Sequence, residues 1–492
     1  MGKAVEESKG VPRNVALDLR GRIAAATGVR RYVITAAQNA TPVHEAFFAS
    51  LLTYCRNRDA QLLVIPYRYK NPTAIWSKRA EHDDWWAPEL APYLIDYRIN
   101  LCDNLVLLGD IKTQPTASVP LQGFESITGK RSGIVGHPKL DLTPVPTPQS
   151  KLPKILTTTG AITRRNYIES KAGKKAEFHH TFAAAVVEID SDTFHLRQLV
   201  SMDDGSFMDV SNVSGAGGTV EYSGATIRRN LPAEALVMGD THEEFIDPNV
   251  ERVTFGKDGI VARLRPKVLV WHDVHDAYAR NHHHWGEVFI NYAKHHAKKD
   301  NVERALAGTF AFVDRVSPSY AQNVFVASNH PEAIAKWVKT ADPKLDPENA
   351  VFWAKTFVAM LAGSKWTDTG ASTIDPFAYW GKKMLKCAAR SRFLARDESY
   401  IIKGIELSFH GDKGSNGAKG SLKGFEKIGV KTVTGDSHTP GISGGAYKVG
   451  LSARYALEYA KGGPSSWLHT HCVIYANGKR SLINIMATGF TA

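Results

Sequence analysis

The sequence is poor in cysteine and has no long apolar run. Its four cysteines lie far apart and none belongs to a CxxC pair: Cys55, Cys102, Cys387 and Cys472. We therefore expect neither a disulfide framework nor a cysteine-based zinc site, which fits a reducing compartment. No run approaches the ~18 apolar residues of a transmembrane helix, and the polar start MGKAVEESK is unlike a signal peptide. These absences predict a cytoplasmic protein that does not associate with membranes.

Acidic residues are in deficit as well. The chain of 492 residues has 61 Lys and Arg against 49 Asp and Glu, a formal net charge of +12 at pH 7. Such a surplus favours polyanionic partners, because phosphates bound by the protein release counterions. A soluble basic protein without a nucleic-acid partner would have the same balance. The apolar share of 43% is ordinary for a globular protein, and the length predicts two or three domains.

Familiar nucleotide-binding and nucleophile motifs are missing. No GxGxxG follows the first expected strand, so the N-terminal half is not expected to bind a dinucleotide. Residues 123–130 approach a phosphate loop, but Arg131 stands where Ser or Thr would bind magnesium. The segment 441–445 fits GxSxG, yet Pro440 separates it from the preceding strand, whereas a nucleophilic serine needs a strand that leads directly into it. We expect a glycine loop at 441–445 instead.

The pattern of apolar residues in the N-terminal half is typical of an α/β domain. Residues 1–30 are predicted to be a polar arm, and 31–230 an α/β domain of unassigned role. Two buried strands flank a helical pattern, which predicts a βαβ unit, and the prolines of 138–153 predict an extended connector. Alternation over 178–230 predicts antiparallel strands. The first helix is expected at 42–56, and strands at 31–37, 61–66, 104–110 and 154–160.

A different sequence pattern begins at about residue 231. Five short apolar runs are each followed by a cluster of Asp, His or Asn, and helical patterns lie between them. The carboxyl ends of successive strands are where α/β sheets place their active sites. The runs are 235–238, 268–271, 324–327, 405–409 and 431–434. The clusters are 239–242, 272–276, 328–330, 410 and 435–438, and helices are expected at 286–299, 301–316, 331–340, 348–363 and 376–390.

The clusters offer carboxylate oxygen, amide oxygen and imidazole nitrogen, but no thiolate. That mixture suits Mn, Fe or Zn at a two-metal site better than a structural zinc site. Two ions roughly 3.5–4 Å apart can share a carboxylate, lower the pKa of a bound water and clamp both reacting oxygens at phosphorus. The alternative is that these strands simply end in polar loops.

The ordered series resembles the motifs of the calcineurin-like metallophosphoesterases. Their pattern is DxH, GDxxD, GNH, H and GHxH, and the five clusters match it in order over residues 231–492. The resemblance implies that 231–492 is the catalytic domain, an αββα sandwich that follows the N-terminal α/β domain. It also implies hydrolysis of a phosphoester by a metal-bound hydroxide.

The resemblance implies a role for each matched residue. One metal would be held by Asp240, His242 and His438, and the other by Asn329, His410 and Asp436, with Asp273 bridging the two. His330 would be the general acid that protonates the leaving oxygen, and Asp276 would orient its neighbours.

The series departs from the family pattern at three positions. His272 and Ser328 stand where the family has glycine, and Asp436 replaces the first histidine of GHxH. A carboxylate at 436 makes the second site harder and more anionic, which favours Mn²⁺ or Mg²⁺ over Zn²⁺. We therefore expect two divalent ions, with Mn²⁺ preferred and Mg²⁺ as the alternative.

The distribution of basic residues favours DNA as the substrate. The glycine-rich segment 411–431 lies between two ligand strands and contains Lys413, Lys419 and Lys423, which could follow a phosphate backbone. Arg164 and Arg165 belong to a second basic patch. Either patch could instead be merely solvated.

Within the family, an α/β half before a diverged metal centre is similar to the early-acting DNase of T5-like bacteriophages. That resemblance implies DNA degradation in the cytoplasm of an infected bacterium by a homo-oligomeric enzyme. A phosphomonoesterase acting on proteins or nucleotides would share every ligand, but would lose little activity at raised salt. A non-catalytic protein with a decayed centre would bind DNA or a partner without releasing phosphate.

Overall fold

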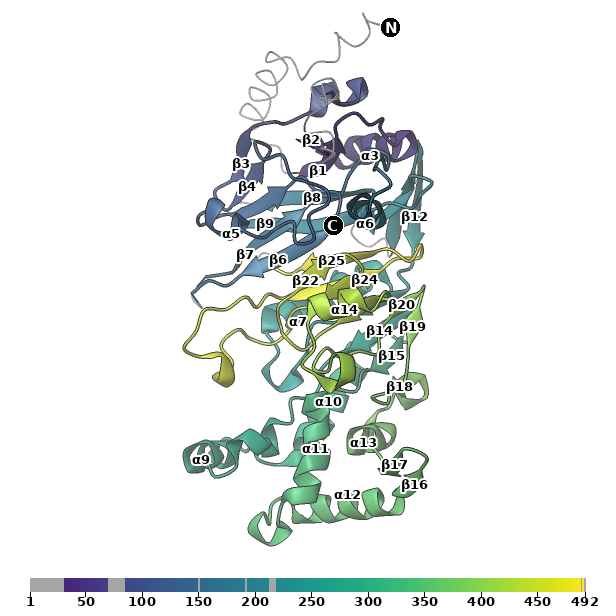
Figure 1. Cartoon of the computed structure of the whole chain (residues 1–492). Coiled ribbons are helices and arrows are strands. Elements are labelled where there is room, and N and C mark those ends of the chain that lie inside the picture. The colour runs from purple at the N-terminus through teal and green to yellow at the C-terminus, as the bar shows by residue number, and fades with distance from the viewer. Residues whose placement is uncertain are drawn as a thin grey trace, which may run out of the picture.

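The computed structural model describes residues 31–69, 85–148, 151–190, 193–211, 218–487 and 489–490. The expected arm, residues 1–30, lies outside them. The fold is mixed α/β, with two large mixed sheets, and the helices of residues 288–384 gather at one end of the molecule (Figure 1). None of the helices in these ranges is long and apolar enough to cross a membrane.

The predicted βαβ unit is present at the start of the described chain. Strands β1 (Arg31–Gln38) and β2 (Gln61–Tyr67) are parallel and flank helix α3 (Glu45–Arg58). Nearly every residue of both strands is buried, because the strands are covered on both faces. Strands β8 (Ala183–Asp190) and β9 (Thr193–Val200) complete a four-stranded sheet in the order β2-β1-β8-β9, and β8 and β9 are antiparallel as the alternation predicts.

A buried ion network fastens this sheet to the following strand, β10 (Phe207–Val210). Arg197 Nε lies 2.7 Å from Asp209 Oδ1, and Arg197 Nη1 lies 2.9 Å from Glu188 Oε2, with all three side chains at most 4% exposed. Burial opposes the charged form of Asp209, but Arg197 outweighs it and lowers the pKa of that carboxyl. Arg58, 3.4 Å from Asp209, and Arg31, 2.8 Å from Glu188, are further partners of the two carboxylates.

We expect Arg197→Ala to lower the free energy of unfolding by about 3–5 kcal/mol, because it removes the guanidinium that contacts both buried carboxylates. Urea unfolding followed by circular dichroism measures the change. The exposed pair of Arg315 and Glu251, 2.7 Å apart, provides the matched control, and Arg315→Ala should cost at most about 1 kcal/mol. Because the pKa of Asp209 is lowered, the stabilisation is present at neutral pH and is lost as acid protonates this carboxyl. An equal cost for both variants would contradict the prediction.

A six-stranded sheet forms the centre of the C-terminal half. Its order is β18-β15-β14-β13-β24-β25, in which the first four strands are parallel and the last two antiparallel. The bounds are β13 (Ala235–Val237), β14 (Val268–Trp271), β15 (Gln322–Phe325), β18 (Ser391–Phe393), β24 (Thr470–Ile474) and β25 (Arg480–Asn484).

A ten-stranded sheet draws strands from both halves of the chain, in the order β19-β20-β21-β23-β22-β6-β7-β5-β4-β3. Strand β6 (Asp141–Val145) lies within the segment 138–153, so the predicted connector contains a strand that pairs with β22 (Gly441–Ser443). The division near residue 230 stays a prediction, but this sheet is continuous across it. The other strands are β3 (Arg98–Cys102), β4 (Leu105–Leu108), β5 (Ser132–Val135), β7 (Lys154–Thr158), β19 (Ile401–Ile402), β20 (Ile405–Glu406), β21 (Lys431–Thr434) and β23 (Ala446–Lys448).

Alternating side chains of the six-stranded sheet enter two different cores. Val237 and Val270 pack in one core with Val433 of the ten-stranded sheet. Their neighbours Leu236 and Trp271 point the other way, into a core shared with helices. The two sheets are therefore stacked, and helices cover the outer face of the smaller one (Figure 1).

The helices expected after residue 231 are present within a few residues of their predicted bounds, except that the last of them ends at Met384 instead of residue 390. They are α9 (Val288–His296), α10 (Val302–Val316), α11 (Asn329–Thr340), α12 (Ala350–Ala362) and α13 (Pro376–Met384). The remaining α-helices of the described chain are α5 (Phe124–Ile127), α6 (Lys171–His179), α7 (Pro248–Phe255), α8 (Ile260–Leu264) and α14 (Leu422–Lys427). Two small sheets comprise β10 with β11 (Thr219–Ser223) and β12 (Thr226–Leu231), and β16 (Lys365–Thr367) with β17 (Gly370–Ser372).

Candidate metal centre

Loops from both large sheets bring aspartate and histidine side chains together. Asp240 follows β13 and Asp273 follows β14, both in the six-stranded sheet. His410 follows β20 and His438 follows β21, both in the ten-stranded sheet. Because the parallel strands of each sheet end at one edge, the stacked sheets deliver these four buried side chains to the same place.

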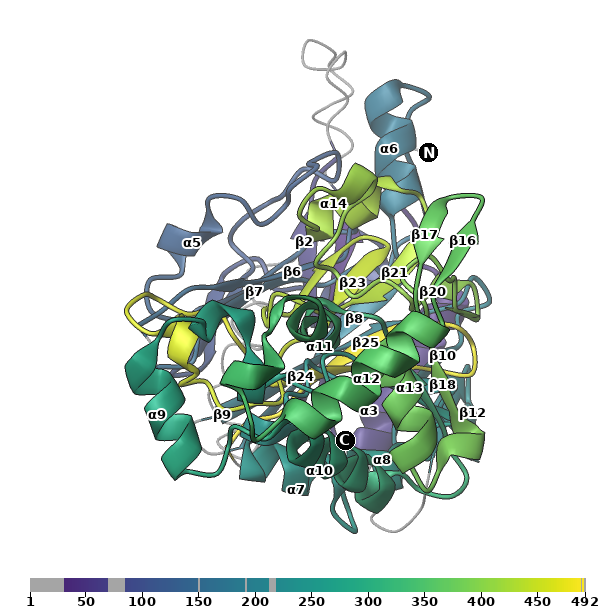
Figure 2. The same ribbon diagram turned by 90° about the horizontal axis from the view of Figure 1, so that it is seen from below.

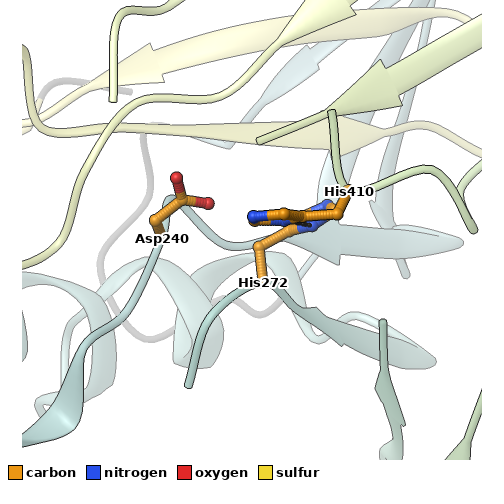
Figure 3. A group of neighbouring side chains, drawn as sticks. All are labelled: Asp240, His272 and His410. Carbon is orange, nitrogen blue, oxygen red and sulfur yellow. Dashed lines mark hydrogen bonds between the residues drawn. The ribbon is translucent and has the colours of Figure 1, made fainter. Parts of the chain in front are cut away.

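Asp240 belongs to two overlapping groups of potential ligands. Its ligand atoms lie within 4.8 Å of those of His242 and His438 in one group, and of His272 and His410 in the other. Figure 3 shows the second group, with the carboxylate of Asp240 directed towards the two imidazole rings. In the first group, His438 Nε2 lies 3.0 Å from His242 Nε2 and 3.4 Å from Asp240 Oδ2.

Asp273 lies beside the second group. Its Oδ2 is 3.0 Å from His410 Nε2 and 4.0 Å from Nε2 of His330. His410 Nδ1 in turn lies 3.2 Å from Nδ1 of His272. Aspartate oxygen therefore lies within reach of imidazole nitrogen in each group, which is the donor set of a divalent-cation site.

Several of these buried atoms have no hydrogen bond. They are both carboxylate oxygens of Asp240, Oδ1 of Asp273 and Nε2 of His272. Buried polar atoms in folded proteins are nearly always hydrogen-bonded, and leaving one unpaired costs about 1–3 kcal/mol. Converging unpaired oxygen and nitrogen atoms fit bound cations, which accept lone pairs from both.

The electrostatics of Asp240, His272 and His438 point the same way, whereas burial is outweighed at His410, where Asp273 raises the pKa of the imidazole to about 9. Burial raises the pKa of Asp240 well above its usual range, and the charges of Asp273 and Asp436 add to this increase. Burial, with the neighbouring His410, lowers the pKa of His272 to about 3, and burial with His242 lowers the pKa of His438. Neutral imidazoles have a free lone pair for a metal, and crowded carboxylates are stabilised by a nearby positive charge.

The backbone is strained at four of the clustered residues. His242, Asp273, Asp436 and His438 have φ values of 41°, 40°, 73° and 58°, in the left-handed region that non-glycine residues seldom adopt. Such conformations cost of order 1–3 kcal/mol each and concentrate at functional sites. The surrounding fold therefore holds these side chains in place against a local preference for other conformations.

Gly435 leaves the space that Asp240 occupies. A Cβ at this position would lie 2.3 Å from Asp240 Oδ1 and 3.1 Å from Cγ of His272. We expect Gly435→Ala to displace both ligands and to weaken Mn²⁺ binding at least about ten-fold, as changes around metal ligands commonly do. Isothermal titration calorimetry measures the affinity. In the control Gly308→Ala, in α10, the new Cβ meets nothing within 4 Å, so Mn²⁺ affinity should stay unchanged; an unchanged affinity in Gly435→Ala would contradict the prediction.

Asp276 connects two histidines at the edge of the centre. Its Oδ1 lies 2.7 Å from His242 Nδ1 and 3.2 Å from His330 Nδ1. Burial opposes the charged form of His330, but Asp273 and Asp276 outweigh it and raise the pKa of this imidazole to about 10. His330 is thus protonated at neutral pH, 19% exposed, and directed with Nε2 towards Asp273.

Two predicted ligands lie nearer to solvent. Asn329 is the first residue of α11 and is exposed, next to His330. Asp436 is half-buried; burial raises the pKa of its carboxyl, against the charge of His410 and with that of Asp273. Asp436 therefore lies within electrostatic reach of the buried groups, while Asn329 lies at the margin of the centre.

Two further residues of the centre are not among the predicted ligands. His272 departs from the glycine of the family pattern, yet the structure places it in a group of potential ligands. The sequence does indicate His272, because a histidine directly after a buried strand is itself expected to be buried and to need a polar partner. Lys448 ends β23 opposite Thr434, where burial lowers its pKa and the charges of Asp436 and Asp240 oppose that decrease. No motif marks Lys448.

The predicted nucleic-acid-binding lysines differ in their surroundings. Lys413 and Lys419 are exposed, and their backbones form an antiparallel β-bridge in the loop that follows His410. The charge of Lys419 also acts on the carboxyl of Asp436. Lys423 instead turns inward: its Nζ donates to Ser443 Oγ at 2.8 Å and lies 3.6 Å from Asp141. Lys413 and Lys419 are thus exposed near the centre, and Lys423, whose side chain is 44% exposed, also has partners within the fold. Their predicted role in binding DNA stays a prediction.

The two arginines lie in the N-terminal half. Arg164 is 3.6 Å from the exposed Glu45, and Arg165 is 3.4 Å from the exposed Asp203. The guanidinium of Arg165 also lies over the ring of Phe182, 4.7 Å from its centroid. Both are surface residues in weak pairs, so their predicted role in binding DNA stays a prediction.

A cavity of about 560 Å³ opens beside the centre, where α11 meets the ends of β15 and β18. Ser328, Lys336 and Arg396 are among the residues that line it. Arg396 pairs with Glu332 at 2.5 Å and with Asp412 at 2.8 Å, and Asp412 follows His410 by two residues. Arg396 therefore links the cavity wall to the loop that follows His410.

Together, fold and site define a mixed α/β protein with a buried aspartate–histidine cluster suited to divalent cations. The chain is 33% identical over 474 residues to Protein A1 of Escherichia phage T5, and the alignment covers 94% of this chain and 83% of that protein. The chain belongs to the family of this phage protein. The predicted similarity to a protein of T5-like bacteriophages is confirmed at this level, whereas the relative's name states no activity. No protein-family profile and no solved structure matches the chain.

Proposed function

We propose that the protein is a metal-dependent phosphodiesterase that hydrolyses DNA. The observation that carries the proposal is the convergence of buried oxygen and nitrogen atoms without hydrogen bonds at the ends of strands from two stacked sheets. The order of the five clusters along the chain supports membership in the calcineurin-like metallophosphoesterases. The helix-covered stack of two sheets is compatible with the αββα sandwich of that superfamily.

The donor set suits two divalent cations. Asp240, His242 and His438 would hold one, and His410 and Asp436, with Asn329, the other. Asp273 would lie between the ions, and His272 is a further candidate ligand. The oxygen-rich set favours Mn²⁺, with Mg²⁺ as the alternative. When bound, such ions activate water and stabilise the charge that develops on a phosphoryl group.

The residues around the ligands supply orientation and a proton. The backbone carbonyl of Asp276 accepts from His330 Nδ1 at 3.0 Å, and the Asp276 carboxylate lies 3.2 Å from the same nitrogen. Both contacts hold the ring with Nε2 towards the centre. His330 would donate the proton at Nε2 to the leaving oxygen of the ester, the general-acid role. Asp276 contacts His242 as well, so one carboxylate positions both the proton donor and a ligand.

The charge distribution favours DNA as the substrate. The chain has a net charge of +12, and the exposed Lys413 and Lys419 lie on the loop beside Asp436. Membership in a phage protein family fits a role in the cytoplasm of an infected bacterium. The homo-oligomer also stays a prediction; exposed apolar side chains such as Phe289 on α9 and Val358 on α12 would be covered in it.

A second candidate function is a phosphomonoesterase acting on proteins or nucleotides. The specific observation in its favour is the cavity of about 560 Å³ beside the centre, which has the volume of a small-molecule site. A non-catalytic protein with a decayed centre has less support, because the strained ligand loops still bring the donor atoms together.

A plasmid-nicking assay with Mn²⁺, Mg²⁺ or EDTA tests the proposal. We expect nicking with Mn²⁺ and none with EDTA. Because phosphate contacts release counterions, activity should fall steeply as salt rises from about 50 to about 200 mM. Intact plasmid together with salt-insensitive hydrolysis of p-nitrophenyl phosphate would favour the phosphomonoesterase, and DNA binding without either reaction would favour the decayed centre.

A further inference from the structure

A second concentration of positive charge surrounds a cavity of about 370 Å³ away from the metal centre. Its walls come from α6, from α14 and from the starts of β21, β23 and β25, and they include Phe178, Lys431, Lys479 and Arg480. Helices α6 and α14 lie close together at the top of Figure 2. The cavity therefore lies where the N-terminal and C-terminal halves meet.

Arg480 is buried at this cavity without a counter-charge. It is 6% exposed, and its Nη1 donates to the carbonyl oxygens of Thr432 at 2.7 Å and Gly445 at 3.0 Å. Within the described ranges no carboxylate oxygen lies within 4.0 Å of its guanidinium, whose carbon lies 4.2 Å from the ring centroid of Tyr447. A buried charge is costly unless an opposite charge accompanies it, so this guanidinium favours an anion in the cavity.

Two lysines add to the uncompensated charge. Neither Lys431 nor Lys479 forms an ion pair with another described residue, and burial, with Lys431 close by, lowers the pKa of Lys479. Glu426 also lines the cavity, but Lys139 lies 2.6 Å from its carboxylate and neutralises it. The walls therefore present a net positive charge to whatever enters.

An aromatic ring stands at the rim of the same cavity. Phe178, near the end of α6, is 81% exposed, and its ring contacts His179 edge to face with centroids 5.1 Å apart. Exposed aromatic rings beside cationic grooves are what proteins use to stack nucleic-acid bases. We propose that this cavity is a second nucleotide-binding site, in which Lys431, Lys479 and Arg480 bind a phosphate group and Phe178 stacks on the attached base.

The site is separate from the metal centre. Strands β21 and β23 are parallel and both run from the cavity to the centre. Lys431 begins β21, and Asp436 lies beyond its other end. At ~3.3 Å per residue, the two sites are on the order of 10 Å or more apart. Binding at the cavity therefore needs no metal and does not depend on the proposed hydrolysis.

Calorimetric titration of the full chain in EDTA with deoxyadenosine 5′-monophosphate tests this site. We expect saturable binding, and at least about ten-fold weaker binding of deoxyadenosine, which lacks the phosphate. The double variant Lys431→Ala with Lys479→Ala should weaken the monophosphate at least about ten-fold. Phe178→Ala should weaken it about 5- to 100-fold through lost stacking, and the exposed control Lys344→Ala should leave it unchanged.

A short single-stranded oligothymidylate distinguishes a free nucleotide from a nucleotide within a strand. If the double variant binds both ligands more weakly, the site accepts any phosphorylated nucleoside. If it binds only the oligonucleotide more weakly, the site accepts a DNA strand. The proposal is overturned if neither ligand is weakened while circular dichroism shows a folded variant, or if deoxyadenosine binds as well as its monophosphate. An unaffected Phe178→Ala variant would overturn the stacking contact.

Discussion

Asp273→Asn is expected to reduce the rate of DNA nicking by at least about 10³-fold, equivalent to several kcal/mol of lost charge stabilisation. The carboxylate is 2% exposed, its Oδ1 has no hydrogen bond, and its Oδ2 faces His410 at 3.0 Å. The amide of asparagine has the same shape as the carboxylate, but it is neutral. An NH₂ group, which donates hydrogen bonds, replaces one of the two carboxylate oxygens. Two metal ions that share this carboxylate would therefore lose their common ligand.

The comparison requires rate and metal content together. Nicking is measured with saturating Mn²⁺, and bound manganese is counted after gel filtration. Asp258→Asn, an exposed aspartate after α7, is the control and should retain wild-type activity. If Asp273→Asn kept more than about a tenth of the activity with full manganese, Asp273 would not be a shared ligand.

His330→Gln is expected to retain both metals and to lose ~10²- to 10⁴-fold in rate on DNA, the usual contribution of general acid–base help. His330 is protonated because Asp273 and Asp276 raise its pKa to about 10, and its Nε2 faces the centre. Glutamine keeps a polar side chain but supplies no acidic proton. Nicking rates and manganese content measure the outcome.

The choice of leaving group separates a proton donor from a structural residue. A deoxyribose oxygen needs a proton in order to leave, whereas p-nitrophenolate does not. We therefore expect His330→Gln to lose little rate on bis(p-nitrophenyl) phosphate, and the exposed control His296→Gln to lose none on either substrate. Equal losses on both substrates, or loss of manganese, would mean that His330 positions the ligands instead of donating a proton.

The local elements of this protein follow from its sequence. The alternation around 31–67 predicted two parallel strands and a helix, which the structure contains. The strand ends after 231 were predictable because short β-branched and aromatic runs stop at polar residues, and helical apolar spacing separates them. The chemistry of the ligands was readable as well, since Asp240, His242 and Asp273 occur at strand ends in a recognisable order.

Contacts between distant parts of the chain could not be predicted from the sequence. Strand β6 joins β22 across about 300 residues of sequence, so the proline-rich segment became part of a sheet that spans both halves. Lys423, a predicted DNA contact, also lies 3.6 Å from Asp141 of β6, a neighbour that no local pattern indicates. Periodicity reports which face of an element is apolar, and it does not report which element will cover that face.

The sequence by itself determined which residue types stand at the strand ends, and hence the donor atoms that a metal could use. Only the tertiary structure decided that Asp240 and Asp273 arrive from one sheet while His410 and His438 arrive from another. It also brought His272 into the ligand group and left Arg480 buried beside a cavity without a counter-charge. The reason is physical: stacking of two sheets is set by the burial of both apolar faces at once, a property of the whole chain that no local segment contains.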